Sequence, residues 1–177
     1  PGPQGGSVGS WSFEASRGDN QALAELGFVV VVMEGTSNPL RSKNFHDMSY
    51  GNMAENTLPD QIASIRQLAQ QHTYMDTTRV GIWGHSGGGF ATATAMFRYP
   101  DFFKVGLSES GNHDNRNYED DWGERYNGLV QNSDYVAQAN ENYAKNLKGK
   151  LLLAHGLMDD NVPPQNTLLV VEALEKA

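Results

Sequence analysis

Residues 79–90, which read Arg-Val-Gly-Ile-Trp-Gly-His-Ser-Gly-Gly-Gly-Phe, decide the fold of this chain. Residues 79–83 form a short apolar run with β-branched side chains, which is typical of a strand. Residues 87–98 are rich in alanine and indicate a helix, which is expected to stop before Pro100. The glycines at the junction allow strand and helix to approach closely. The stretch therefore predicts a strand, a sharp turn at Ser86 and a helix.

Residues 84–88 match the pattern G-x-S-x-G, which is typical of a nucleophile elbow. Such a turn holds its serine in a strained, exposed conformation at the N-terminus of the helix. We therefore interpret Ser86 as a candidate nucleophile. The N–H of Gly87, the next residue, is the candidate first donor to an oxyanion. An ordinary glycine-rich turn between a strand and a helix is the alternative.

Apolar runs elsewhere in the chain predict three more strands, at residues 28–33, 103–108 and 150–155. The runs 28–33 and 150–155 lack polar alternation, which indicates strands buried on both faces of a parallel sheet. Helices are expected at residues 20–26, 58–71 and 164–176, and over part of 136–147. A long polar loop and a polar, aromatic-rich insertion are expected at residues 34–57 and 109–135. The alternation predicts an α/β fold, a mostly parallel sheet flanked by helices.

A candidate acid follows the last predicted strand. In α/β-hydrolases the chain order is serine, then Asp or Glu, then His, and ligand sites lie at the carboxyl ends of the strands. Residues 150–155 run into a loop that contains Asp159 and Asp160, so both the order and the position fit. The alternative is a pair that forms a turn and caps the next helix.

The base of such a triad is missing, because all five histidines precede the candidate acid. His85 is expected to pack beside the nucleophile, and His155 to hydrogen-bond within the core. The others are expected in loops or at a helix end: His46, His72 and His113. The sequence therefore predicts an incomplete triad.

The composition narrows the class of partner. The 177 residues fit one domain, and the formal net charge of −8 argues against nucleic acid or an anionic membrane as the main partner. The absence of cysteine excludes disulfides and thiolate metal sites. The pairs His46–Asp47 and His113–Asp114 lack the spacing of metal ligands. No metal, cofactor or membrane span is expected.

At these motifs the chain resembles the catalytic domain of the prolyl oligopeptidase family of serine peptidases, in particular its dipeptidyl-peptidase IV-like branch. The resemblance covers essentially the whole chain and rests on residues 1–4, 83–89, 123–128 and 155–162. It implies an α/β-hydrolase fold in which Ser86 is the nucleophile and Asp159 is the triad acid.

The resemblance also implies how a peptide substrate would be held. Asn161 would contact the substrate backbone. Tyr118, Trp122 and Val162 match positions that line the pocket for the residue before the cut bond, normally proline or alanine. The family usually has tyrosine where Trp122 stands and an aromatic residue where Gly87 stands, so this chain departs from the pattern at two positions.

Three family features fall outside the 177 residues: a tyrosine that donates to the oxyanion, the catalytic histidine and a propeller domain that gates the site. We therefore interpret residues 1–177 as a partial catalytic domain of a serine exopeptidase that acts near the N-terminus of peptides. By the same resemblance, the longer parent is compatible with a homodimer and with a periplasmic or secreted location. The alternatives are an esterase or lipase on the same fold, and a fragment that is inert without its histidine.

Overall fold

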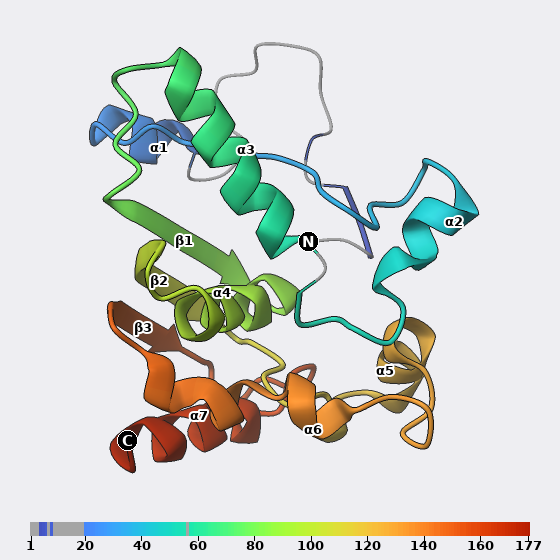
Figure 1. The fold of residues 1–177 in the computed structure, drawn as a ribbon. Coiled ribbons are helices and arrows are strands. Elements are labelled where there is room, and N and C mark those ends of the chain that lie inside the picture. Colours follow the sequence, from blue (N-terminus) through green and yellow to red (C-terminus); the bar gives the residue numbers. More distant parts are fainter. Residues whose placement is uncertain (1–3, 7, 9–19, 56) are drawn as a thin grey trace.

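Three parallel strands in the order β1-β2-β3 form the sheet of the computed structural model, which describes residues 4–6, 8, 20–55 and 57–177. The strands are β1 (Val80–His85), β2 (Phe103–Glu109) and β3 (Lys150–Ala154). The α-helices are α1 (Asn20–Glu25), α2 (Lys43–His46), α3 (Leu58–Gln71), α4 (Gly87–Arg98), α5 (Asp120–Asn127), α6 (Tyr135–Gln138) and α7 (Gln165–Glu175). The short 3-10 helices are η1 (Asp47–Ser49), η2 (Asn115–Asn117) and η3 (Asn140–Asn146). Figure 1 shows this arrangement.

The register of the sheet brings the ends of all three strands to one edge. His85 of β1 pairs with Glu109 of β2, and Glu109 pairs with Ala154 of β3. Because the strands are parallel, the segments that follow them leave the sheet side by side. The elbow at Ser86 and the loop after β3 therefore lie at the same carboxyl edge, with β2 between them.

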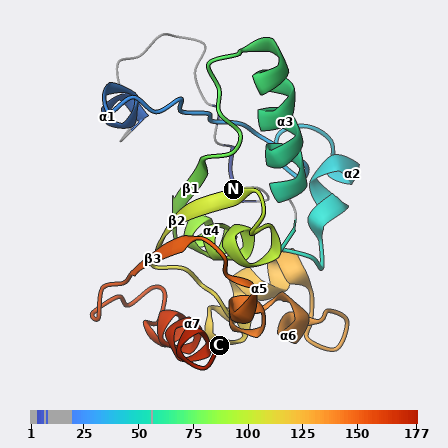
Figure 2. The same ribbon diagram turned by 60° about the vertical axis from the view of Figure 1, so that its left-hand side comes forward.

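One face of the sheet carries the main core. In Figures 1 and 2, α4 lies against the sheet, with α3 above it and α7 below. All three helices contribute to a single apolar cluster, whose largest fully buried members are Leu58, Met96, Phe97, Phe103 and Val170. Burial of each such side chain stabilises the folded state by about 1.5–3 kcal/mol. Because α3 and α7 both pack into the same cluster as α4, they hold α4 from both sides.

The other face of the sheet has no covering layer in the described part of the chain. Trp83, Leu107 and Leu152 are neighbours across the three strands, and all three are exposed, Leu152 to 62%. The expectation that residues 150–155 form a strand buried on both faces is therefore wrong for one face. An apolar run without alternation shows that a strand could be buried on both faces, but within the described residues helices cover only the face that carries the main core.

The expected strand at residues 28–33 is not formed. This segment makes no ladder within the described chain, and Phe28 and Val29 are 62% and 50% exposed. A strand requires a hydrogen-bonded neighbour, and β1 pairs only with β2. The apolar composition of residues 28–33 therefore reflects a propensity for strand but does not show whether a neighbouring strand is available for hydrogen bonding.

Most of the remaining elements follow the expectations, but α2 and η1 lie within residues 34–57, which were expected to form a loop, and His46 is the last residue of α2. The helices expected at 20–26, 58–71, 87–98 and 164–176 form as α1, α3, α4 and α7, and Gly27 after α1 has a φ of +91° that ends the helix. The expected partial helix at 136–147 forms as α6 and η3. The insertion 109–135 contains α5, which was not expected. No helix within the described residues has the length and apolar character to cross a membrane.

Candidate active site

Ser86 occupies a strained backbone conformation at the turn between β1 and α4. Its φ is 57° and its ψ is −121°, outside the regions that residues with a side chain normally adopt. The Ser86 N–H donates to the carbonyl oxygen of Glu109 at 2.9 Å, and the Ser86 carbonyl accepts from the N–H of Phe90 at 3.0 Å. Such strain costs about 1–3 kcal/mol and persists only where neighbouring structure enforces it. The expected strained turn is confirmed, with Ser86 partly exposed.

Two glycines explain why the strand and helix can come so close. A Cβ atom on Gly84 would lie 2.6 Å from the backbone of Gly88. A Cβ atom on Gly89 would lie 2.4 Å from the carbonyl oxygen of Glu109. Neither site has room for a side chain, whereas a Cβ on Gly88 would meet nothing within 4 Å. The close approach expected from the sequence is confirmed at Gly84 and Gly89.

Gly87 is the first residue of α4, a helix of 12 residues. The first N–H groups of a helix have no acceptor within it, and the helix dipole makes this end favourable for negative charge. The Gly87 N–H therefore has no acceptor within the helix and lies directly beside Ser86, the position where a donor to an oxyanion is needed.

Asp159 is held by backbone donors of its own loop. Its Oδ1 accepts from the N–H of Val162 at 2.9 Å and from the N–H of Asn161 at 3.1 Å. Its Oδ2 lies 3.4 Å from Nε2 of His155, and the side chain is 19% exposed. The Val162 N–H is the main cause that lowers the pKa of Asp159 below its usual value. Asp159 is therefore an ionised carboxylate at neutral pH.

Ser110 is part of this arrangement, although the sequence analysis did not single it out. It follows β2, is 6% exposed and has a φ of 45°. Its N–H donates to the carbonyl oxygen of Ala154 at 2.9 Å, and its side-chain hydrogen bond to Asp159 further lowers the pKa of that acid. The sequence could have indicated Ser110 as a site residue, because it directly follows β2, the central strand of the sheet.

The histidines divide between confirmed and corrected expectations. His155 is engaged at both ring nitrogens: Nδ1 lies 2.6 Å from Oγ1 of Thr167, and Nε2 lies 2.9 Å from the carbonyl oxygen of Val162. This confirms its expected role within the core. His85 was expected to pack beside the nucleophile, but its side chain is 65% exposed and lies 3.3 Å from Glu109. Alternation along β1 places it on the uncovered face of the sheet.

His113 lies in the loop between β2 and η2, as expected, and its side chain is fully buried behind the elbow. Its Nδ1 lies 3.1 Å from Nδ2 of Asn140, and its Nε2 lies 3.5 Å from Oγ of Ser108. Ser108 in turn donates to the carbonyl oxygen of Gly89 at 2.8 Å. Burial lowers the pKa of His113 to about 3, so this imidazole is neutral at physiological pH.

The candidate pocket residues come together from the insertion and the acid loop. The Tyr118 hydroxyl donates to Oδ1 of Asn161 at 2.9 Å, although the two are 43 residues apart. Tyr118 and Trp122 form an edge-to-face pair with ring centroids 5.4 Å apart. The ring centroids of Trp122 and Tyr126 are 5.1 Å apart, and both side chains pack against a buried cluster of Met53, Ala54 and Phe90, the last of which lies one turn after the nucleophile. The aromatic row therefore connects the elbow helix to the acid loop.

Val162 and Gln4 also lie at this edge of the sheet. Val162, expected to line the substrate pocket, is only 2% exposed, and its N–H donates to the Asp159 carboxylate. Gln4 accepts from Nε1 of Trp122 at 3.4 Å, which places the end of the 1–4 stretch near the pocket. Residues 1–3 of that stretch lie outside the described part of the chain.

Comparison with known proteins agrees with this geometry. The model of the prolyl oligopeptidase family matches residues 11–177. Dipeptidyl peptidase 8 of Mus musculus is 30% identical over 161 residues, which cover 88% of this chain and 18% of that protein. Venom dipeptidyl peptidase 4 of Vespula vulgaris is 36% identical over 124 residues, which cover 67% of this chain and 16% of that protein. This chain therefore spans less than a fifth of either relative.

The fold of this chain is also similar to that of a solved dipeptidyl peptidase structure. The crystal structure of Porphyromonas gingivalis dipeptidyl peptidase 4 matches with a TM-score of 0.86 and 32% sequence identity. The match covers 97% of this chain and 25% of that one. The α/β-hydrolase fold expected from the motifs, and the resemblance on which it rested, are confirmed.

Proposed function

This chain belongs to the prolyl oligopeptidase family of serine peptidases, and from that premise we propose that it carries the nucleophile, the acid and an oxyanion donor of a dipeptidyl-peptidase-like enzyme. Ser86 is the nucleophile, Asp159 the acid and Gly87 the donor. The observation that supports this most is the combination of a strained serine and an ionised carboxylate at one edge of the sheet.

In the proposed reaction, the Ser86 hydroxyl gives its proton to an imidazole while its oxygen bonds to the carbonyl carbon of the substrate. The Gly87 N–H stabilises the negative charge that develops on the carbonyl oxygen. The imidazolium then protonates the leaving amine as the C–N bond breaks, and water releases the acyl group by the same steps. Asp159 orients the imidazole and stabilises its charged form.

The imidazole in this scheme comes from outside the 177 residues. His155 lies next to the acid, but both of its ring nitrogens already have partners in the loop and in α7. His85 faces Glu109 on the uncovered side of the sheet, and His113 is fully buried. We therefore assign the base to a segment of a longer parent protein, together with the recognition of the substrate's amino end.

The family resemblance implies that Tyr118 and Trp122 line a pocket for proline or alanine. Their edge-to-face ring pair offers an apolar surface that is compatible with such a compact side chain. Asn161 accepts from Tyr118 through its Oδ1, and its NH₂ group, which has no partner among the described residues, could donate to a substrate carbonyl. The proposed preference is therefore Pro or Ala before the cut bond.

Steady-state kinetics of the full-length parent test this proposal. Gly-Pro and Ala-Pro anilides should be cleaved, and Ser86→Ala should reduce kcat by roughly ten-thousandfold or more, because it removes the attacking oxygen. Asp160→Asn is the matched control for Asp159→Asn, since only Asp159 is expected to matter strongly. Fast turnover of short acyl esters with no anilide cleavage would favour the esterase and contradict the peptidase.

The 177-residue chain offers a separate test. Without a base, its Ser86 should react with a fluorophosphonate orders of magnitude more slowly than the same serine in the full-length parent. Equal labelling rates would show that the assignment of the base to another segment is wrong.

A further inference from the structure

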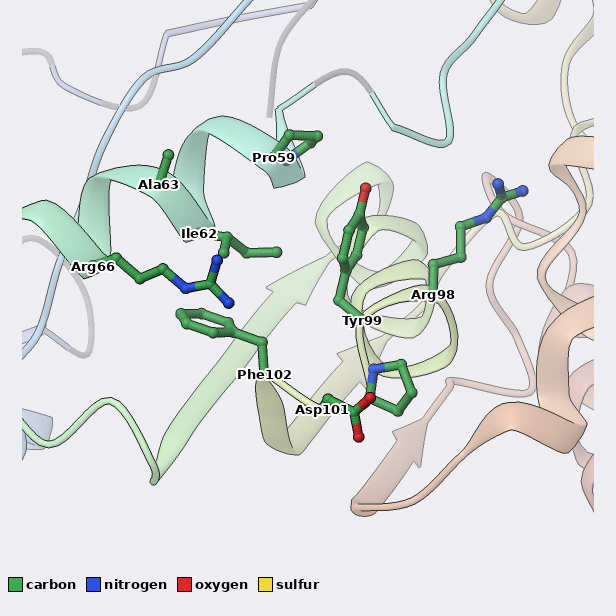
Figure 3. A pocket seen from close by; sticks show the side chains of 9 residues that line it. Pro59, Ile62, Ala63, Arg66, Arg98, Tyr99, Asp101 and Phe102 are labelled. Carbon is green, nitrogen blue, oxygen red and sulfur yellow. The ribbon is translucent and has the colours of Figure 1, made fainter.

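A cleft lies at the end of the sheet opposite the elbow (Figure 3). Helix α4 starts at the elbow and runs back, so its last turn and the residues after it lie where β2 begins. The cleft has a volume of about 420 Å³ and lies between α3 and this turn. Pockets for small molecules measure roughly 300–1,000 Å³, so the size suits a small ligand. No residue is shared with the candidate active site.

The floor of the cleft is apolar and rigid. Ile62 on α3 and Phe102 before β2 are both 7% exposed and belong to the main core. Pro59 and Pro100 form opposite walls, and their fixed backbone angles limit how far those walls can move. A ligand that binds here must therefore present apolar surface to a preformed floor.

Arg66 supplies a cation without a carboxylate partner among the described residues. Its guanidinium lies over the Phe102 ring, 5.2 Å from the centroid, and Figure 3 shows it pointing along the cleft from α3. No acidic residue stands three or four positions from Arg66 on its helix, where an ion pair would form. The ring therefore holds the charge in place but leaves its N–H groups open to an anion.

The other charges around the cleft are already neutralised. Arg98 lies 3.1 Å from Glu55 and also donates to a backbone carbonyl at 2.6 Å. Asp101 lies 2.8 Å from Nζ of Lys148, and this contact lowers the pKa of Asp101. Of the charged side chains that line the cleft, only Arg66 has no ion-pair partner in the described part of the chain, whose full sequence has a net charge of −8.

Tyr99 adds a second donor. Its hydroxyl has no hydrogen-bond partner within the described residues and points toward the start of α3 in Figure 3. Burial raises the pKa of Tyr99, with Glu55 adding to the effect, so the hydroxyl stays protonated. The Tyr99 hydroxyl can donate to an anion, and the neighbouring Arg66 guanidinium can only donate, so the positive charge of Arg66 favours an anion over a cation.

We propose that this cleft binds a small organic acid, with its apolar body on Ile62, Phe102 and the Tyr99 ring and its carboxylate on the Arg66 guanidinium. The site is separate from the proposed hydrolase chemistry and does not depend on it. A carboxylate matches the guanidinium in charge and can form two parallel hydrogen bonds with it.

Binding can be measured on the 177-residue chain with 4-phenylbutyrate, and with 4-phenylbutanol as the uncharged probe of the same shape. NMR shifts of the Ile62 methyl groups and the Tyr99 ring should saturate with the acid. The alcohol should bind about tenfold more weakly, since it loses the charge-assisted hydrogen bonds. Equal binding of the two probes, or shifts that never saturate, would overturn the proposal.

Substitutions locate the site. Arg66→Gln should remove the preference for the acid, whereas Arg41→Gln should leave it unchanged. Arg41 is the matched control because its guanidinium also rests on a ring, 5.1 Å from the centroid of Phe45, away from the cleft. Ala63→Trp should fill the cleft and block both probes while the Arg66 charge remains. Identical behaviour of the two arginine variants, or undiminished binding to Ala63→Trp, would place the acid elsewhere.

Discussion

The elbow and the acid loop lie at the same edge of the sheet, yet different forces hold them in place. The elbow is fixed by steric exclusion, because Gly84 and Gly89 have no room for even a methyl group and Ser86 is forced to a positive φ. The acid loop is fixed by hydrogen bonds to the Asp159 carboxylate and the His155 ring. The first region should therefore fail when volume is added, and the second when a polar partner is removed.

The largest effect is expected from Gly89→Ala. The new Cβ would lie 2.4 Å from the Glu109 carbonyl oxygen, so strand and helix must separate. We expect a loss of about 3 kcal/mol or more in the free energy of unfolding. Gly88→Ala is the control, because its Cβ meets nothing and alanine favours the helix, so it should stabilise by up to about 1 kcal/mol. Urea unfolding measures both, and equal losses would contradict the steric explanation.

The second effect is a loss of folding stability at acidic pH, caused by the buried His113 behind the elbow. The pKa of His113 is about 3 in the folded chain and about 6.5 when unfolded. Between these values only the unfolded chain takes up the proton, so stability falls as the pH falls. This group should make the chain about 2 kcal/mol less stable at pH 5 than at pH 7.

His113→Gln should abolish that part of the pH dependence, whatever it does to stability at pH 7. His72→Gln, at the end of α3, is the control and should keep the full slope. Urea unfolding at several pH values provides the measurement. A slope that persists in His113→Gln would mean that another group binds the protons.

A smaller effect is expected in the acid loop. Thr167→Val keeps the shape of the side chain but removes the hydroxyl 2.6 Å from Nδ1 of His155. The loss should be about 1 kcal/mol, the usual net contribution of a hydrogen bond. Thr73→Val, at an exposed position, should change stability very little. If the two substitutions cost the same, the His155 hydrogen bond does not hold the loop.

An effect of similar size but opposite sign is expected at Ser86. Ser86→Gly should raise the stability of the chain by about 1 kcal/mol, because glycine tolerates a positive φ. Ser86→Ala retains a Cβ and therefore the strain, so its stability should match that of the natural chain. Thermal unfolding compares the two, and a glycine variant no more stable than the alanine variant would show that Ser86 is unstrained.

The same contrast explains what the sequence could predict. The elbow is local: strand, serine, glycines and helix are contiguous, so the pattern of residues 79–98 predicted its geometry. Residues 28–33 are different, because their apolar composition shows a tendency to form a strand but not whether a neighbour is available. The expectation for His85 was wrong for the same reason. The sequence does not show that one face of the sheet lacks a covering layer, and His85 lies on that face.

Helix α5 shows the limit of local propensity. Gly123 in its interior disfavours a helix, so residues 109–135 read as an irregular insertion. In the structure, Trp122 and Tyr126 are one turn apart and pack together against the buried cluster that contains Phe90. That long-range packing outweighs the local cost. It also brings Tyr118 to Asn161, a contact that no spacing in the sequence encodes.

Mapping the site of a covalent adduct addresses the proposed pairing of serine and acid. The full-length parent would be treated with diisopropyl fluorophosphate and the modified residue identified by mass spectrometry. We expect one adduct, on Ser86, formed at least a hundredfold more slowly in Asp159→Asn, which loses the residue that orients the base. An adduct on another serine, such as Ser110, or an unchanged rate in Asp159→Asn, would contradict the assignment of this edge of the sheet as the catalytic site.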